Sequence, residues 1–263
     1  MAALDVEALR AALGSYAAVD VVDSTGSTNA DLVAAADSAA DRTVLIAEQQ
    51  TAGRGRRARD WVSPPASGIY LSVLLRPTGV PVARYGSLSL VAGVALIRTA
   101  RHAGVIASLK WPNDLLAGAG LAKCAGVLAE VSGQAVVLGI GLNVAPLHDD
   151  VPVGPGGLPA TSLAQEGGTA DRTAVAIALL RAFDEAERSW RGAQGDLLTS
   201  GLLAEYRASC ATLGQRVRVE LPDGTSLQAL ATDIDGDGRL VVDVGGTART
   251  LSAGDVVHVR PGA

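Results

Sequence analysis

The amino-acid sequence predicts an α+β fold with a mixed, mostly antiparallel sheet, followed by a small β-barrel-like domain. Hydrophobic residues make up 48% of the 263 residues and charged residues 19%, which is typical of a globular chain. In the first four fifths of the chain, stretches with helical periodicity alternate with short β-rich runs. From Gly214 onward the runs are short and alternating, with Gly-containing turns between them. We therefore expect one domain over residues 1–212 and a second over residues 213–263.

The first domain is expected to begin with a helix and then to alternate strands with helices. Apolar residues recur at helical spacing behind polar capping residues, which predicts helices at 5–13, 27–40, 84–103, 171–191 and 195–209. Short β-rich runs predict strands at 19–22, 43–48, 69–75, 107–110, 115–116, 122–131 and 135–144. The last four of these strands are joined by Gly-containing turns, which favours antiparallel pairing. The segments 50–65 and 145–159 are rich in Gly or Pro and are expected to be irregular.

The second domain is predicted from four short strands, at 216–221, 227–234, 240–244 and 256–259. The turn 233–238 imitates the start of an EF-hand loop, with three alternating aspartates before Gly238. Its twelfth position is Val244 where calcium loops carry a bidentate glutamate, and its flanks are predicted strands. We therefore expect no calcium site, and we assign no metal ligand to the protein.

Composition narrows the class of function. The net charge of −5 argues against a broad nucleic-acid footprint, so we expect no DNA partner. No apolar run approaches the ~20 residues that span a bilayer, and the first residues lack the basic segment of a signal peptide. We therefore expect a cytoplasmic protein without membrane contact. Reduced thiols at Cys124 and Cys210 fit that compartment.

The basic residues are distributed unevenly. Of the 22 Lys and Arg residues, only Lys110 and Lys123 are lysines. Arginine serves wherever a generic positive charge is enough, so these two positions are expected to need a compact ammonium group. The alternative is chance survival of two surface lysines. Their neighbourhoods favour the first interpretation.

Four arginines, at positions 54, 56, 57 and 59, lie in the segment 50–61. Glycines in this segment let the backbone approach a ligand, and guanidinium groups donate paired hydrogen bonds to phosphate or carboxylate. The cations would repel one another without an anion, so we expect the loop to become ordered on ligand binding. Trp61 could stack on a nucleobase. The alternatives are a solvated surface turn for the arginines and a core anchor for Trp61.

The turn at 111–113 places polar groups next to Lys110, and the second lysine lies at the start of a later predicted strand. Pro112 fixes the turn and brings Asp114 next to Lys110, although Pro-Asn-Asp read alone is an ordinary hairpin turn. In the strand 122–131, alternation would send Lys123 and Ala125 to one face and Cys124 to the other. A charge at the start of an apolar strand needs a partner, and an anionic ligand would provide one.

The strand 139–144 carries Gly139 and Gly141 at alternating positions, which leaves room on one face of it. It ends near Asn143, a single amide after an apolar run. That arrangement suits recognition of a base edge or of a metal-bound phosphate.

Together these segments resemble the biotin protein ligase family, in the family's order along the chain. The segments that carry the resemblance are Ser27-Thr28-Asn29, Gly53-Arg54-Gly55-Arg56-Arg57 ending in Trp61, Lys110-Trp111-Pro112-Asn113-Asp114, Lys123 with Ala125-Gly126, and Gly139 to Val144. The resemblance implies a class II synthetase-like biotin/lipoate ligase core and an SH3-like C-terminal barrel. Cys124 departs from the family, which usually has a larger aliphatic residue there. The motifs begin by Ser27, so the chain resembles the enzyme-only class, which lacks the N-terminal DNA-binding domain of the repressor members.

The resemblance implies a two-step reaction. Biotin's carboxylate attacks the α-phosphate of ATP to give biotinyl-5′-AMP, and a lysine of a biotin carboxyl carrier domain of an acyl-CoA carboxylase then takes the acyl group. Mg²⁺ would accompany the phosphates. No protein nucleophile is needed, and catalysis would come from positioning and charge neutralisation.

The resemblance also implies roles for particular residues. The catalytic group would comprise Lys123, Arg56 and Asp114. Biotin would be bound by Ser27, Thr28, Asn29, Gln50, Gly53, Arg54 and Lys123. ATP or the adenylate would be bound by Arg56, Arg57, Arg59, Trp61, Asn113 and Asn143. Asp114 would orient the incoming lysine amine or accept its proton.

Two other functions stay open at this point. A lipoate or octanoate ligase could share the main fold, and a non-catalytic biotin-sensing regulator could share the binding site. The arginine loop and the Lys-Trp-Pro-Asn-Asp turn favour the biotin enzyme, and the negative charge disfavours a DNA-binding regulator. We expect a monomer or a weak homodimer.

Overall fold

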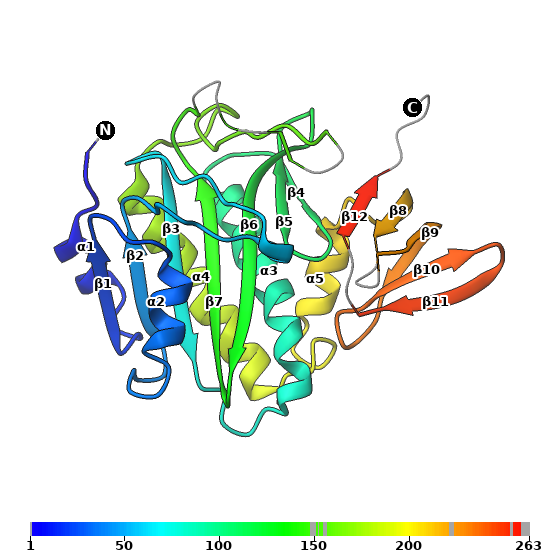
Figure 1. Cartoon of the computed structure of the whole chain (residues 1–263), viewed down its shortest axis with the longest axis horizontal. Helices are drawn as coiled ribbons and strands as arrows, with labels where there is room; N and C mark the ends of the chain where they lie inside the picture. The colour runs from blue at the N-terminus through cyan, green and yellow to red at the C-terminus, as the bar shows by residue number, and fades with distance from the viewer. Residues whose placement is uncertain are drawn as a thin grey trace.

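The computed structural model describes residues 2–147, 151, 153–154, 157–220, 224–252 and 255–258. It contains a seven-stranded sheet and a five-stranded sheet (Figure 1). The seven-stranded sheet has the order β1-β2-β3-β7-β6-β5-β4. Its strands are β1 Ala18–Val22, β2 Thr43–Ala47, β3 Gly68–Leu75, β4 Ala107–Lys110, β5 Asp114–Ala117, β6 Ala122–Ser132 and β7 Ala135–Asn143. Among the seven described strands of this sheet, β1 and β2 alone pair in parallel, which confirms the predicted mixed, mostly antiparallel sheet.

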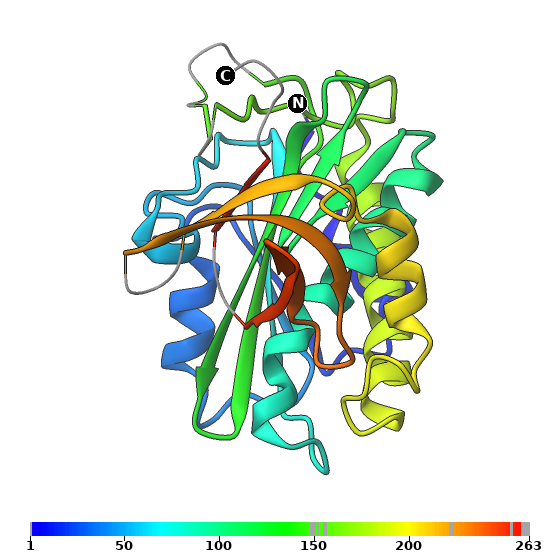
Figure 2. The ribbon, with the colours of Figure 1, turned by 90° about the vertical axis from the view of Figure 1, so that its right-hand side faces the viewer.

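Helices cover both faces of the large sheet. They are α1 Val6–Ala12, α2 Thr28–Ala34, α3 Leu88–His102, α4 Arg172–Gly192 and α5 Leu202–Ser209, with short 3₁₀ segments η1 Arg56–Ala58 and η2 Val82–Ser87. α2 lies on one face, where Leu32 packs on Leu74 and Val137, and α3 and α4 lie on the other (Figure 2). All eight residues of β3 are buried because the strand is covered on both faces. No described helix is long and apolar enough to cross a membrane.

Two helices are shorter than predicted. α2 ends at Ala34 instead of residue 40, because the residues that follow are mainly alanine, serine and aspartate and offer the sheet little apolar surface. α5 begins at Leu202 instead of residue 195. Gly195 and Gly201 have φ values of +83° and +77°, and left-handed residues interrupt a right-handed helix.

The alternation predicted for β6 is wrong at Cys124. The pairing of β5 with β6 shifts there, because Leu115 is opposite Ala125 while Leu116 is opposite Lys123. This bulge puts Cys124 and Ala125 together in the core, and Lys123 shares the other side of the sheet with Gly126. Burial raises the pKa of the Cys124 thiol to about 12, so the thiol behaves as a small apolar group.

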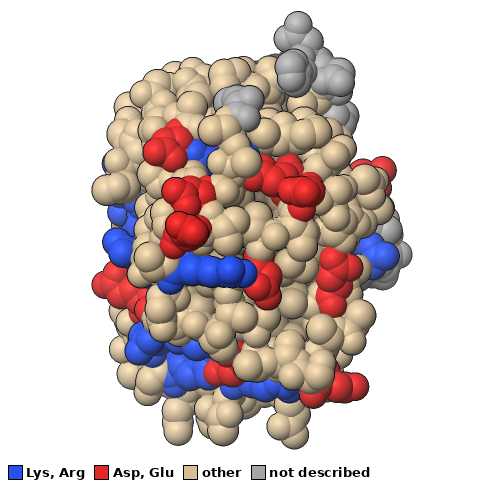
Figure 3. Space-filling view, turned by 90° about the vertical axis from the view of Figure 1, so that its left-hand side faces the viewer, with Lys and Arg blue, Asp and Glu red and all other residues tan. Residues whose placement is uncertain are grey.

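Both edges of the large sheet are occupied in the described chain. At the β1 edge, Nε of Arg10 donates to the carbonyl of Val19, over 3.0 Å. The face that carries α1 and β1 has acidic and basic side chains interspersed (Figure 3). At the β4 edge, the backbone N–H of Ala211 donates to the carbonyl of Leu109, over 2.8 Å. Charged and covered edges of this kind limit further strand pairing.

The second sheet has the order β11-β10-β9-β8-β12. Its strands are β8 Arg216–Glu220, β9 Ser226–Ile234, β10 Leu240–Val244, β11 Thr247–Leu251 and β12 Asp255–His258. The predicted barrel is not closed in the described residues, because β11 pairs only with β10 and β12, four residues long, pairs only with β8. β11 was not predicted because its first four residues are all exposed, so it has no apolar alternation. Val259, in the last predicted strand, lies outside the described residues.

The second sheet packs directly against the first part of the chain. The indole Nε1 of Trp111 donates to the carbonyl of Gly238, over 2.9 Å. The apolar core continues from the large sheet into Val217, Val219 and Val256. The division of the chain into domains at residues 212 and 213 stays a prediction.

Candidate functional site

A pocket opens on the face of the large sheet that carries α2. The arginine loop, the start of α2, the turn between β4 and β5, and strands β6 and β7 surround it. Twelve of the fourteen predicted site residues line this pocket: Ser27, Thr28, Asn29, Gln50, Arg54, Arg56, Arg59, Trp61, Asn113, Asp114, Lys123 and Asn143. Gly53 and Arg57 do not line it. Residues far apart in sequence are therefore brought together at one pocket.

Three residues form an ion-paired group at the centre of the pocket. Nζ of Lys123 lies 2.7 Å from Oδ1 of Asp114, and Nζ of Lys110 lies 3.5 Å from Oδ2. Register places Lys110 opposite Asp114 across β4 and β5. Burial alone would raise the pKa of Asp114, but the two ammonium groups outweigh it, and its pKa lies below the ordinary value. Asp114 is therefore ionised at neutral pH.

Glycines on β6 and β7 make room for the aromatic ring of Trp61. A Cβ atom on Gly141 would stand 2.4 Å from the indole ring, and one on Gly126 would stand 3.1 Å from it. Nζ of Lys123 lies 5.5 Å from the ring centroid, within cation–π range. The indole Nε1 is buried without a hydrogen-bond partner among the described residues. Both interpretations of Trp61 therefore have support, because the ring packs on the sheet and also lines the pocket.

The arginine loop folds back on itself as a narrow hairpin. The backbone N–H of Trp61 donates to the carbonyl of Gly53 over 2.9 Å, and that of Gly55 donates to Arg59 over 2.6 Å. A Cβ atom on Gly53 would stand 2.4 Å from the carbonyl oxygen of Trp61. Gly53 is thus required by the close approach of the two arms of the loop.

The arginines of this loop point in two directions. Nη1 of Arg56 donates to Oδ1 of Asn113 over 3.2 Å, and Asn113 in turn donates to the carbonyl of Val127 over 2.9 Å. Arg57 has φ +57° and donates instead to the backbone carbonyl of Glu220 on β8, over 3.2 Å. Its guanidinium also lies 3.7 Å from the Glu220 carboxylate. Arg57 therefore fastens the loop to the second sheet, while Arg54, Arg56 and Arg59 line the pocket.

Around the start of α2, the pocket is lined by hydrogen-bonded polar side chains, and Asn29 also donates to the Glu130 carboxylate over 2.7 Å. Oε1 of Gln50 accepts from the backbone N–H of Thr28 over 2.9 Å, and Ser27 caps α2 by accepting from the backbone N–H of Ala30. The hydroxyls of Thr28 and Ser72 lie 2.8 Å apart, and Ser72 donates to Oδ1 of Asn29 over 2.6 Å. This chain fixes the orientation of donors and acceptors that line the pocket.

The end of β7 is held by the segment that follows it. Nδ2 of Asn143 donates to the carbonyl of Thr161 over 2.9 Å. The backbone N–H of Thr161 donates to the carbonyl of Lys123 over 2.9 Å, and that of Lys123 donates to Pro159 over 2.7 Å. Asn143 and Lys123 are thus fixed by the same short segment.

The sequence did not reveal every residue at the pocket. It missed Val256 and the described residues Val151, Val153, Gly154, Leu158 and Ala160, which also line the pocket. These lie in an irregular segment or in the second sheet, without a motif. Lys110, expected at the site as one of the two lysines, does line the pocket. In the described residues no three His, Cys, Asp or Glu side chains gather as a metal site. The described residues therefore offer no cluster of ligands that would hold a metal ion.

Comparison with known proteins shows which family the chain resembles in sequence. The family described as Biotin/lipoate A/B protein ligase family matches residues 19–145, and the Biotin protein ligase C terminal domain matches residues 212–259. The biotin-[acetyl-CoA-carboxylase] ligase of Mycobacterium tuberculosis is 49% identical over 251 residues, covering 92% of this chain and 89% of that protein. The chain belongs to the biotin protein ligase family.

Two further members of the biotin protein ligase family are less similar to this chain than the Mycobacterium ligase. The bifunctional ligase/repressor BirA of Bacillus subtilis is 31% identical, over 90% of this chain and 72% of that protein. The biotin protein ligase of Aquifex aeolicus, solved in complex with biotin and ATP, superposes with a TM-score of 0.75 at 24% identity. That likeness covers 93% of this chain and all of the Aquifex chain, and it shows that the two share a fold.

Proposed function

We propose that this member of the biotin protein ligase family activates biotin with ATP and transfers it to a lysine of a biotin carboxyl carrier domain. A carboxylate oxygen of biotin attacks the α-phosphorus of ATP, and pyrophosphate leaves. The acceptor amine then attacks the acyl carbon of biotinyl-5′-AMP, AMP leaves, and the amine loses a proton. Support comes from the family, from the 49% identity to a biotin-[acetyl-CoA-carboxylase] ligase and from the cationic pocket.

Lys123 would neutralise the two anions that meet in the first step. It reaches the pocket from β6, beside arginines 54, 56 and 59, which also line it. Bringing a carboxylate to a phosphate requires positive charge fixed in advance, and a partly buried ammonium group supplies it. Asn113 holds Arg56 in place through the hydrogen bond of 3.2 Å. Any Mg²⁺ would enter with the phosphates of ATP, and no step here depends on it.

Asp114 would orient the incoming lysine amine. Because its pKa is lowered and it is already paired with two ammonium groups, it is a poor proton acceptor. Its carboxylate would accept a hydrogen bond from the neutral acceptor amine and so direct the amine toward the acyl carbon of the adenylate. We assign it orientation and no proton transfer.

The two ends of the pocket suit the two ends of biotinyl-5′-AMP. The neutral polar chain at Ser27, Thr28, Asn29 and Gln50 offers donors and acceptors for the ureido head group. Trp61 and Asn143 would serve the adenylate, and Trp61 carries a buried N–H that has no partner among the described residues. Gly53 and Arg57 would act on the shape of the loop. Cytoplasmic location and a carrier domain as partner belong to the same proposal.

The observation that carries this proposal is the meeting of Lys123, Asp114 and Arg56 at one pocket. Its test is biotin-dependent exchange of labelled pyrophosphate into ATP, with lipoate as the competing acid. Exchange with biotin alone, lost in Lys123→Arg, is the expected result. Equal exchange with lipoate would instead indicate the wider acyl-ligase class.

A further inference from the structure

Two ammonium groups share one buried carboxylate in the pocket. The side chains of Lys110 and Asp114 are 14% and 10% exposed, and that of Lys123 is 23% exposed. Lys123 makes the shorter contact, 2.7 Å against 3.5 Å for Lys110. Counting formal charges, the group carries one net positive charge. The attraction of an anionic ligand to this group depends on that net charge and not on the number of lysines.

Lys123 has a second partner in the proposed reaction, because it faces the ligand's carboxylate and phosphate. Any movement of its ammonium group toward those anions weakens its hold on Asp114. A buried carboxylate without a counter-ion is strongly unfavourable, and it would also repel the incoming anions. A second cation that stays with Asp114 removes both costs.

We propose that Lys110 is this second cation: it keeps Asp114 neutralised so that Lys123 can turn to the anionic ligand. Lys110 is a positioning residue, since it acts through Asp114 and Lys123. Its place in the fold suits the role. It is the last residue of β4 and lies directly opposite Asp114 in the strand pairing, so the backbone holds the two side chains together. The lowered pKa of Asp114, to which both lysines contribute, agrees with this geometry.

The inference rests on the proposed adenylation, and charge arithmetic supplies its test. Lys110→Met reduces the net charge of the group from plus one to zero, and Lys110→Met with Asp114→Asn restores it to plus one. Pyrophosphate exchange is the proper assay because it reports the first step without the acceptor. We expect Lys110→Met to slow exchange by about tenfold or more. When Asp114→Asn is already present, the same Lys110→Met change should slow exchange much less, because the carboxylate that Lys110 neutralises is gone.

Two results of the exchange assay would overturn the inference, and a third would show that the proposed function fails. A Lys110→Met variant that exchanges at the unsubstituted rate shows that Lys110 is not needed. A double variant as slow as Lys110→Met shows that Lys110 acts on the ligand directly and not through Asp114. If the unsubstituted chain shows no biotin-dependent exchange, the proposed function fails, and a second measurement still tests the ion-paired group.

That second measurement uses the rarity of lysine. Because the chain has two lysines, ¹³C-lysine labelling of the full chain gives two side-chain Cε signals, assigned with Lys110→Met. We expect Asp114→Asn to shift both signals in the ligand-free protein. Adding biotinyl-5′-AMP should shift the Lys123 signal and leave the Lys110 signal close to its place. A Lys110 signal unmoved by Asp114→Asn, or shifted by the adenylate as much as Lys123, contradicts the inference.

Discussion

The ring of Trp61 occupies the space that a side chain on Gly141 would fill. An ideal Cβ at Gly141 would lie 2.4 Å from Cε2 of the indole, closer than packed atoms approach. Gly141 pairs with Gly126 across β6 and β7, and both glycines lie beneath the ring. Two side-chain-free positions therefore form the surface on which this part of the arginine loop rests.

Gly141→Ala should displace Trp61 from the sheet. The extra methyl group meets the rigid indole ring and not a flexible chain end, so overpacking should cost about 1–3 kcal/mol of unfolding free energy. We expect ATP to bind about tenfold more weakly, because the loop that carries the arginines moves with the ring. Calorimetric titration and tryptophan fluorescence measure the two effects.

Gly14→Ala is the matched control for this change. Nothing lies within 4 Å of a Cβ at Gly14, so binding and stability should stay near those of the unsubstituted chain. Equal nucleotide affinity in Gly141→Ala and Gly14→Ala would show that the position of Trp61 does not matter for the nucleotide.

Arg57→Ala should release the arginine loop from the second sheet. Arg57 donates to the carbonyl of Glu220, and its side chain is 34% exposed, so the loss in overall stability should be small, about 0–1 kcal/mol. We expect a larger effect on retention of the adenylate, since a detached loop admits water to the acyl phosphate. The rate at which biotinyl-5′-AMP leaves or is hydrolysed, without acceptor, measures this. Arg249→Ala, at an exposed position of β11, is the control, and an equal rate in both variants would exclude the role.

Local patterns in the sequence predicted most elements of the large sheet, because each element has its own apolar rhythm. β3 and β7, for example, consist mostly of apolar residues and begin and end close to the expected residues. The bulge at Cys124 was not predictable, since it depends on how β6 pairs with β5. The start of α5 could have been placed better, because Gly195 and Gly201 are frequent helix breakers.

The sequence predicted the pocket residues that belong to motifs. It did not predict those that packing of distant elements brings to the pocket. Lys123 and Asp114 were both expected at the site from the resemblance, and the structure places Nζ and Oδ1 2.7 Å apart. Val256 also lines the pocket, but it lies in the second sheet, 133 residues after Lys123, and no local pattern indicates this contact. The partner of Arg57, Glu220, is likewise 163 residues away.

His258 should make stability depend on pH below neutrality. Burial, with the nearby charge of Lys110, lowers the pKa of His258 from 6.5 to about 4. Between these values the unfolded chain binds a proton that the folded chain does not, so stability falls as pH decreases through this window. Above it both states are neutral, and the full contribution is present.

Urea unfolding between pH 7 and pH 5 measures this effect, in the range before most carboxylates titrate. His258→Gln should flatten the dependence, because glutamine can keep a hydrogen bond to Thr212 without titrating. In the folded protein Nε2 of His258 lies 3.1 Å from that hydroxyl. The same slope in both proteins would assign the dependence to other groups.

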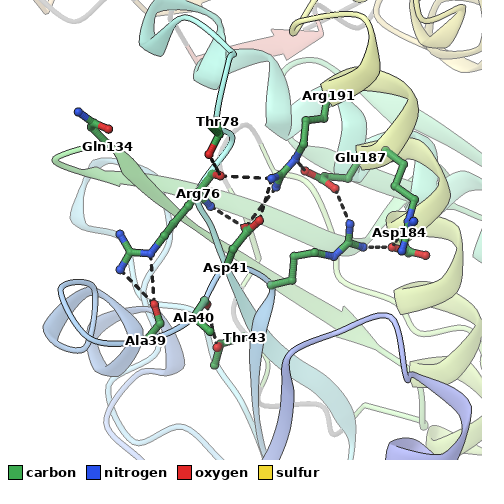
Figure 4. A network of polar contacts seen from close by, with 12 residues as sticks. Ala39, Ala40, Asp41, Thr43, Arg76, Thr78, Gln134, Asp184, Glu187 and Arg191 are labelled. Carbon is green, nitrogen blue, oxygen red and sulfur yellow. Dashed lines mark hydrogen bonds and ion pairs between the residues drawn. The ribbon is translucent and has the colours of Figure 1, made fainter.

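Glu187→Ala should destabilise the protein without altering the pocket. This carboxylate is fully buried on α4 between two guanidinium groups, 3.0 Å from Nη1 of Arg42 and 2.6 Å from Nε of Arg191. Figure 4 shows Arg191 reaching on to Asp41, which joins the helix to the start of β2. Removing one partner of a buried ion pair costs about 3–5 kcal/mol.

The control for Glu187→Ala lies on the same helix. The side chain of Glu185 is 74% exposed and 3.4 Å from Arg98, so Glu185→Ala should cost about 0–1 kcal/mol. Thermal unfolding compares the two variants. Biotin affinity of the folded protein should be unchanged in both, because neither residue lines the pocket. A similar loss of stability in both would mean that burial of Glu187 does not determine the cost.

The chain should also resist labelling by its own adenylate. Its two lysines are paired with Asp114, and their side chains are only 14% and 23% exposed, so neither amine is readily reached from solvent. Biotinyl-5′-AMP that leaves the pocket would therefore find no free lysine side chain on the enzyme. Incubation with biotin and ATP, followed by peptide mass spectrometry, should show little biotin on Lys110 or Lys123.

The informative variant is Arg249→Lys, which adds a lysine at an exposed position of β11. Labelling at residue 249 alone would show that adenylate escapes and that the native lysines are protected by their ion pairs. Heavy labelling of Lys110 or Lys123 would show that pairing with Asp114 does not suppress their reactivity.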